Sequence, residues 1–315
     1  MPKLDRALDR AFDRALNHEL DCKLGTMTSA WTSERIAEAF LRACRAELTA
    51  LKPGNVHIHA GGHGMDVATF ESAAIAAAPH VVDASLTTGA RIRRAVEASM
   101  TAAGCNTNLG ILLLCVPLAV AAMASDEGNL RNRLEFVLNT LNHHDTEDVF
   151  AAIRTANPGG LGTSNEADVA APPAIPLLEA MAIAAPRDRI AANYVSGFRD
   201  IFEDHLPLLT RTIKGTADSP PPTRDDAVAT LYMSILARFP DSHIRRKYGM
   251  ETAAHVQHLA RSARAHWSHV VQPSNYAELL KLDALLKFER WNPGTTADFV
   301  VATAFAAEID DKLDH

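Results

Sequence analysis

The chain has 315 residues, in which 31 Lys and Arg against 38 Asp and Glu give a formal net charge of −7. This length allows one large domain with an extensive hydrophobic core. Acidic and basic residues are mixed along the chain, and only 6% of residues are aromatic. The composition therefore argues against a basic nucleic-acid-binding face and against a stacking platform for single strands.

Residues 1–26 are interpreted as an N-terminal amphipathic appendage to a main helical domain that spans residues 27–315. In this segment Leu4, Leu8, Phe12 and Leu16 recur at every fourth position among Asp-Arg pairs, which predicts a narrow apolar stripe on a charged helix. Such a helix suits packing on the body or on a partner subunit, which is compatible with a homodimer. The segment lacks the apolar block of a signal peptide, and the four cysteines form no CxxC pair, as expected of free thiols in a reducing cytoplasm.

Apolar residues at helical spacing predict about a dozen helices and no strands. No window alternates with a period of two, and no Asn-Gly or Asp-Gly hairpin signal occurs. The fold class is therefore all-α, in a single large domain. We expect helices from Ser33 to Leu51, at 67–78, 87–103 and 109–124, from Leu130 to Leu141, after an N-cap at Asp145, at 175–184 and 187–204, after a capping box at Thr223 and Asp226, and at 251–269, 275–290 and 296–311.

The most apolar stretch is 109–124, which contains no charged side chain. It predicts a helix that is buried on every side. With 16 residues and an internal Pro117, it is shorter than a membrane span, which needs about 20. Directly before it stand Asn106, Thr107 and Asn108, where free backbone N–H groups and the helix dipole favour an anion such as a phosphate. The simpler interpretation is an ordinary N-cap by Asn108 or Thr107.

Three more polar clusters lie beside predicted helix ends. Their candidate functional residues are Lys52, Asn55 and Asp66 in the first cluster, Asp241, Arg246 and Lys247 in the second, and Asn292 and Asp298 in the third. Three carboxylates with amides and a basic run are what a magnesium-bound polyphosphate site requires, because Mg²⁺ takes one or two carboxylates beside substrate oxygens. Each residue also has a simpler explanation as a helix cap, a dipole partner or a solvated charge.

Other motifs are absent or weak. His57, His59 and His63 suggest a zinc-dependent hydrolase, although no second ligand cluster accompanies them. The sequence contains no P-loop, no dinucleotide fingerprint and no GxSxG elbow. A nucleotide would therefore be bound by helices and their connecting loops rather than by a standard motif.

Together the four clusters resemble the triphosphoribosyl-dephospho-CoA synthase family over about residues 34–311. The resemblance is carried by Lys52-Pro53-Gly54-Asn55-Val56 with Met65-Asp66, Asn106-Thr107 with Gly110, Asp241-Ser242 with Gly249, and Asn292-Pro293-Gly294 with Ala297-Asp298. It implies a cytoplasmic enzyme that transfers the triphosphoribosyl group of ATP to a hydroxyl of 3′-dephospho-CoA and releases adenine, with Mg²⁺ as cofactor. Small molecules would be its partners, rather than nucleic acid or a membrane.

Within this resemblance we assign Asp66 and Asp298 to the Mg²⁺–triphosphate complex and Asp241 to the base or to stabilisation of an oxocarbenium-like state, the three roles being interchangeable. The neutral polar residues Asn55, Asn106, Thr107, Asn108 and Asn292 would position ribose or phosphates. Lys52, Arg246 and Lys247 would act as charge partners.

One departure from the family pattern concerns the cluster Asn106-Thr107-Asn108 that precedes the most apolar stretch. Citrate-lyase members have a His-Lys pair where this chain has Asn108-Leu109, and the segment looks more like the archaeal and methylotroph branch. The departure leaves open another coenzyme precursor as acceptor, such as a methanopterin or methanofuran intermediate. A helical nucleotide-binding protein without turnover is the third alternative.

Overall fold

The described part of the chain is built from α-helices, and the loop over residues 50–66 is one of its longer connections. A computed structural model describes residues 31–124, 128–159, 169–215 and 221–310, and no strand occurs in them. The predicted all-α class is confirmed. The helices are α2 (Ser33–Thr49), α3 (Val67–Val81), α4 (Thr88–Ala103), α5 (Leu109–Met123), α6 (Leu130–Asn139), α7 (His143–Ala156), α8 (Leu177–Ala184), α9 (Arg189–Val195), α10 (Leu206–Lys214), α11 (Arg224–Arg238), α12 (Ser242–Tyr248), α13 (Met250–Ser262), α14 (Tyr276–Phe288) and α15 (Gly294–Ile309).

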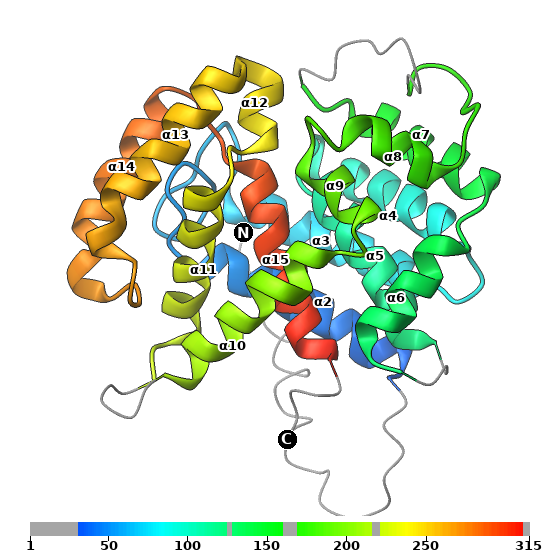
Figure 1. Cartoon of the computed structure of the whole chain (residues 1–315), viewed down its shortest axis with the longest axis horizontal. Coiled ribbons are helices and arrows are strands. Elements are labelled where there is room, and N and C mark those ends of the chain that lie inside the picture. Colours follow the sequence, from blue (N-terminus) through cyan, green and yellow to red (C-terminus); the bar gives the residue numbers. More distant parts are fainter. Residues whose placement is uncertain (1–30, 125–127, 160–168, 216–220, 311–315) are drawn as a thin grey trace, which may run out of the picture.

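The centre of the fold is formed by α5 and α15, which pack against each other and against α2. In α5 every residue except Gly110, Val120 and Met123 is buried, which confirms the prediction for this stretch. Helices α3, α4 and α7 cover one side of this centre, whereas α11, α13 and α14 form the other (Figure 1). None of the described helices is long and apolar enough to cross a membrane.

The predicted helix over 187–204 is interrupted. Helix α9 ends at Val195, and Gly197 and Phe198 both have positive φ angles, of 60° and 55°. The Asn193 side chain accepts a hydrogen bond from the N–H of Asp200 and donates one to the Asp200 carboxylate, and these two hydrogen bonds fix the turn. The chain continues as a π-helix, Asp200–His205, and then as α10. The apolar spacing continued across the break, so periodicity alone did not reveal it.

Two smaller corrections concern helix ends. Asp145 is the third residue of α7 rather than its N-cap, and it forms a capping box with the true N-cap, Asn142. The predicted helix 251–269 ends at Ser262 and is followed by a 3₁₀ turn, Ala263–His266. The predicted appendage, residues 1–26, lies outside the described residues.

Candidate functional site

All four polar clusters of the sequence contribute residues to one cavity of about 470 Å³. It lies where the N-terminal ends of α5, α12 and α15 meet the end of α2 and the loop before α3. The predicted residues that line it are Asn55, Asn106, Thr107, Arg246, Asn292 and Asp298. The cavity thus brings together predicted residues that lie up to 243 positions apart in sequence, from Asn55 to Asp298.

Asp298 packs directly against the first turn of α5. A Cβ atom built at Gly110 would lie 2.0 Å from Asp298 Oδ2 and 2.5 Å from its Cγ, so only glycine leaves room for the carboxyl group. Burial and the nearby charge of Asp241 raise the pKa of Asp298 well above its usual range. A backbone hydrogen bond from Ile111 and the charge of Arg246 act in the opposite direction. A buried carboxyl that lacks a close cation is a group that a bound cation would stabilise.

A chain of hydrogen bonds forms the polar wall beside Asp298. Lys52 is fully buried; its ammonium group pairs with Glu47 and donates to Asn55 Oδ1 at 2.9 Å. Asn55 Nδ2 then donates to Asn292 Oδ1 at 2.8 Å. Because an ammonium group only donates, Lys52 fixes the orientation of both amides along this chain. Glu47, Asn55 and Asn292 line the cavity, whereas Lys52 supports them from behind.

The buried Lys52–Glu47 pair has an electrostatic cost that its hydrogen bonds offset in part. Burial, together with the positive charge of Lys287, lowers the pKa of Lys52 well below its usual range. The charges of Asp298 and Asp283 oppose this shift. Contact with the Glu47 carboxylate also favours the ammonium form.

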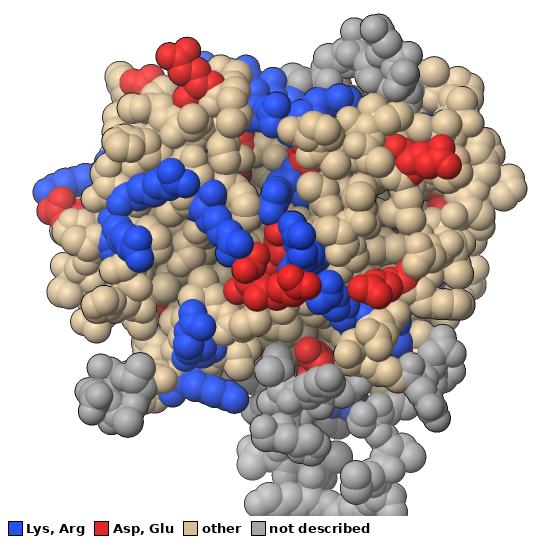
Figure 2. All heavy atoms as spheres, viewed as in Figure 1, with Lys and Arg blue, Asp and Glu red and all other residues tan. Residues whose placement is uncertain are grey.

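Arginines from two segments line the other polar wall. Arg187 precedes α9, and Arg245 and Arg246 belong to α12. Arg246 donates to the carbonyl of Gly159 at 3.1 Å and lies 3.5 Å from Asp188, the N-cap of α9. Figure 2 shows Lys and Arg side chains gathered over α12, toward α8, whereas the rest of this face mixes both signs of charge. These arginines provide the local positive charge that a polyphosphate needs.

His243 lines the cavity on the same side, from the first turn of α12. Burial is the main cause that lowers its pKa to about 4, and the charges of Arg246, Lys247 and His63 add to this. The imidazole is therefore neutral at pH 7, with one nitrogen that donates and one that accepts.

Thr107 adds an unpartnered polar atom to the cavity. Its Oγ1 is buried and makes no hydrogen bond with any described residue. Asn106 Oδ1 instead receives the N–H of Leu109 at 3.3 Å and so takes the capping role at α5. The expected cap, Asn108, accepts a hydrogen bond from Ser99, and its amide nitrogen is buried without a described partner. Asn108 is thus the N-cap residue of α5, as the simpler interpretation predicted, but its side chain makes no capping hydrogen bond.

The remaining wall is apolar and comes mainly from α3, α5, α7, α8 and α9. Its side chains carry no hydrogen-bonding group apart from the weakly polar thioether of methionine. They are Phe70, Leu109, Ile111, Leu113, Phe150, Ile153, Leu177, Ala180, Met181, Ile183, Ala184, Ile190 and Ala191. A cavity with one polar wall and one apolar wall is typical of sites that bind small organic molecules.

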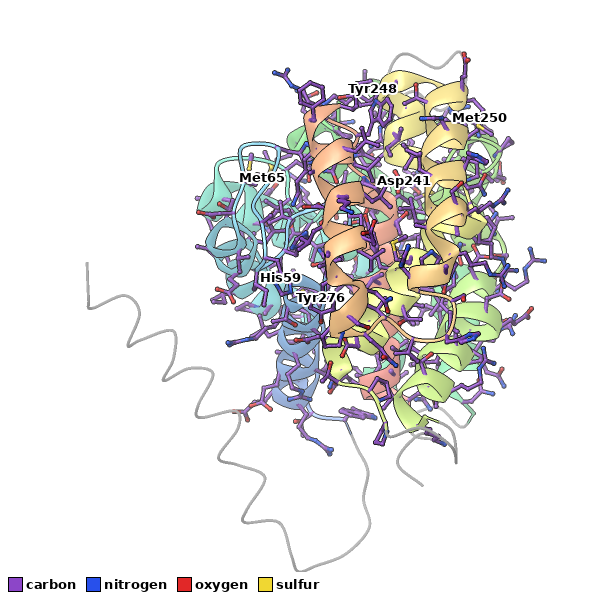
Figure 3. All side chains as sticks on the ribbon, turned by 90° about the vertical axis from the view of Figure 1, so that its left-hand side faces the viewer. His59, Met65, Asp241, Tyr248, Met250 and Tyr276 are labelled. Carbon is purple, nitrogen blue, oxygen red and sulfur yellow. The ribbon has the colours of Figure 1, made fainter. Side chains whose placement is uncertain are left out.

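Asp241 lies behind the cavity wall rather than in it. Its Oδ1 caps α12 by accepting the N–H groups of His243 and Ile244, and its Oδ2 accepts both the N–H and the hydroxyl of Thr296 at 2.8 Å. Figure 3 shows it in the interior, between the helices of this side. Burial raises the pKa of Asp241, and the four donated hydrogen bonds oppose that shift. The geometry is that of a structural link between α12 and α15.

Three further predicted residues do not line the cavity. Asp66 is exposed at the N-cap of α3, where its Oδ1 receives the N–H and the hydroxyl of Thr69. Those hydrogen bonds lower its pKa. Its neighbour Met65 does line the cavity. Lys247 is exposed and stacks over the ring of Tyr248, and Asn108 is buried behind the cavity.

The three histidines of the first loop do not converge. His57 lies 3.3 Å from Asp283, and His63 contacts the carbonyl oxygen of Gly54 at 2.8 Å. His59 stacks edge-on against Tyr276 (Figure 3). Within the part of the chain that the structure describes, no group of three His, Cys, Asp or Glu side chains could hold a metal ion. The structure therefore gives the hydrolase interpretation no support.

Sequence reasoning missed Glu47, Arg187, Asp188 and His243 as cavity residues. A signal existed for Glu47, because it lies eleven residues after Ile36 on the apolar stripe of α2, where a charged side chain is unusual. The other three lie in polar contexts at helix ends, and their sequence surroundings do not distinguish them from ordinary surface residues.

Comparisons with known proteins show what this chain is similar to. A crystal structure from Archaeoglobus fulgidus, provisionally assigned as a triphosphoribosyl-dephospho-CoA synthase, is 27% identical to this chain, with a TM-score of 0.57. The match covers 75% of this chain and 96% of that one. A search of proteins with curated functions found no significant match. The model of a transferase family, CitG, described as ATP:dephospho-CoA triphosphoribosyl transferase, matches residues 33–315, and the chain belongs to this family.

Proposed function

We propose that this protein transfers the triphosphoribosyl group of ATP to a hydroxyl of dephospho-CoA or of a related coenzyme precursor, with release of adenine. The observation that supports this most is the set of residues that line the cavity described above. Arginines on one side suit a triphosphate, and carboxylates and amides on the other suit a sugar. Membership of the transferase family gives the reaction class.

The triphosphate would bind along Arg187, Arg245 and Arg246. Arginine suits this task because its planar donors pair with two phosphate oxygens at once. Holding the donor at its triphosphate fixes the sugar in one position, which lowers the entropic part of the barrier. Lys247, which does not line the cavity, would contribute only at a distance.

The residues present fit a magnesium ion that arrives with the triphosphate. Such an ion needs only one or two protein carboxylates, since phosphate oxygens and water complete its shell. Asp298 would hold the ion. Asp188 also lines the cavity and lies near enough to Asp298 for its charge to raise the pKa of Asp298. When bound, Mg²⁺ would neutralise part of the triphosphate charge. Asp66, assigned to the metal from the sequence, lies outside the cavity lining and could reach such an ion only if the loop before α3 moved.

Cleavage of the bond between ribose and adenine develops positive charge on the sugar. The carboxylates of Glu47 and Asp298 face the cavity and would stabilise that charge electrostatically. Asn106, Thr107 and Asn292 would hold sugar or phosphate oxygens in place. The neutral imidazole of His243 and the unpartnered hydroxyl of Thr107 are further contacts for substrate.

Mass spectrometry of the products tests this proposal. Incubation with Mg-ATP and dephospho-CoA should yield free adenine and an adduct that carries the added triphosphoribosyl mass. The formation of ADP instead would overturn it in favour of kinase or ligase chemistry. ATP binding without any product would favour a non-catalytic nucleotide-binding protein.

A second acceptor class is favoured by one observation. Leu109 lines the cavity at the position where citrate-lyase members of the family have a lysine. An apolar side chain there cannot pair with a phosphate of the acceptor. Adenine release that is stimulated by a methanopterin or methanofuran precursor, and not by dephospho-CoA, would identify this second class.

A further inference from the structure

Glu47 presents an unused carboxylate oxygen to the cavity. The side chain is almost fully buried, with only 3% of the residue exposed, and it lines the cavity. Its Oε1 pairs with the ammonium group of Lys52, whereas its Oε2 makes no hydrogen bond with the described residues. This oxygen is not among the buried side-chain atoms that lack a partner, so it is accessible from the cavity that Glu47 lines. A ligand that donates a hydrogen bond can therefore reach it.

Lys52 determines what kind of ligand group can bind here. Pairing with the ammonium favours the ionised form of Glu47, and an ionised carboxylate only accepts hydrogen bonds. A phosphate oxygen would be repelled at this position. A group that carries a polar hydrogen would instead form a charge-assisted hydrogen bond.

The neighbouring amides present the opposite polarity. Lys52 donates to Asn55 Oδ1, so the amide nitrogen of Asn55 faces Asn292. Asn292 uses its oxygen for that bond, which leaves its own amide nitrogen as the donor for a ligand. The wall thus combines an acceptor at Glu47 with a donor at Asn292. Hydroxyl groups match both, because a hydroxyl donates and accepts.

We propose that Glu47 and Asn292 recognise the vicinal hydroxyls of a ribose. This inference rests on the proposed function, which supplies two riboses, that of ATP and that of the dephospho-CoA acceptor. It assigns a specificity-determining role to Glu47 and a positioning role to the fully buried Lys52, which orients the two amides without touching substrate.

Calorimetry with ribose analogues on the intact protein tests the proposal. The probes are ATP and dephospho-CoA, each compared with its 2′-deoxy and 2′-fluoro forms. Fluorine replaces the hydroxyl at similar size but cannot donate a hydrogen bond. For the nucleotide whose ribose lies at Glu47, loss of the charge-assisted hydrogen bond should weaken the binding of its 2′-deoxy and 2′-fluoro forms to the wild-type protein by about 10- to 100-fold. The nucleotide that shows this preference identifies which ribose lies at Glu47.

Glu47→Gln reverses the polarity of the group without changing its shape. Its amide oxygen must face Lys52, since Lys52 only donates, so its amide nitrogen faces the cavity. The variant should bind the hydroxyl form less well and the fluoro form better, which shrinks the preference at least about tenfold. Asn292→Ala, which leaves the buried ion pair intact, should weaken the same hydroxyl-bearing ligand.

A matched control is Glu308→Gln, which also disturbs ion pairs, with Arg42 and Arg224, but does not line the cavity. Glu308→Gln should keep the wild-type preference for the hydroxyl form of the nucleotide over its fluoro form. If both nucleotides bind but neither shows a preference for the hydroxyl that depends on Glu47, the ribose assignment is overturned while the proposed reaction stands. If ATP does not bind the wild-type protein, the proposed function itself fails, and this inference fails with it.

Discussion

The contact between Gly110 and Asp298 leads to a quantitative prediction. Replacing Gly110 by Ala places a Cβ atom 2.0 Å from Asp298 Oδ2 and 2.9 Å from Ile190 Cδ1. At an ordinary interior position of a helix, this substitution stabilises by about 1 kcal/mol. Here overpacking costs about 1 to 3 kcal/mol, so we expect a net loss of about 1 kcal/mol.

The effect on activity should be larger than the effect on stability. The carboxyl group of Asp298 can escape the clash only by moving away from α5, and a displacement of about 1 Å in a site costs on the order of 100-fold in rate. Urea unfolding measures the first quantity, and adenine release from Mg-ATP measures the second.

The double variant with Asp298→Ala provides the control. Once the carboxyl group is absent, the main clash is gone, and Gly110→Ala should stabilise this background by up to about 1 kcal/mol. A change of sign between the two backgrounds is the expected result. A Gly110→Ala variant that is as active as the wild type and more stable would refute the close contact between residue 110 and Asp298.

The remaining predictions concern pH, a structural carboxylate and the arginine wall. Burial lowers the pKa of His205 to about 4, so between about pH 6.5 and pH 4 the unfolded chain binds a proton that the folded chain does not. The free energy of unfolding should therefore decrease as the pH falls through this range. In His205→Leu, up to about 3 kcal/mol of that decrease should be absent from unfolding curves, and a pH profile identical to that of the wild type would contradict this expectation. Asp241→Asn should lower the free energy of unfolding by about 2 to 3 kcal/mol, because one amide oxygen cannot accept all four hydrogen bonds that the carboxylate accepts. A variant with full stability but no activity would instead support the catalytic role predicted from the sequence. Arg246→Ala should weaken ATP binding about 10- to 100-fold in calorimetry, with Lys247→Ala weaker in its effect; equal losses would show that the exposed Lys247 also meets the triphosphate.

Periodicity and capping rules predicted most of the helical fold. The uncharged stretch of α5 and the capping residue Thr223 of α11 are where they were expected. The interruption after α9 was missed because Phe198 continues the apolar spacing, although its backbone has a positive φ of 55°. Side-chain spacing reports which face is buried, and it carries no information about a local left-handed residue.

The site was predicted in outline only. Residues of all four polar clusters meet in the cavity, but the sequence could not distinguish carboxylates that face it from carboxylates that cap helices. Asp241 and Asp298 each stand near a helix start, yet one receives four hydrogen bonds from the protein and the other faces the cavity. That difference depends on how α12 and α15 pack, which is tertiary information.

The walls of the cavity are drawn from nearly the whole length of the chain, from Glu47 in α2 to Asp298 in α15. An unfolded chain cannot reproduce such a surface, so any compound that fills it will bind the native state alone. At a concentration 100 times its dissociation constant, such a compound adds about 2.7 kcal/mol to the free energy of unfolding. Melting curves recorded with libraries of hydroxyl-bearing coenzyme precursors in the presence of Mg-ATP can therefore reveal the acceptor before any product has been identified.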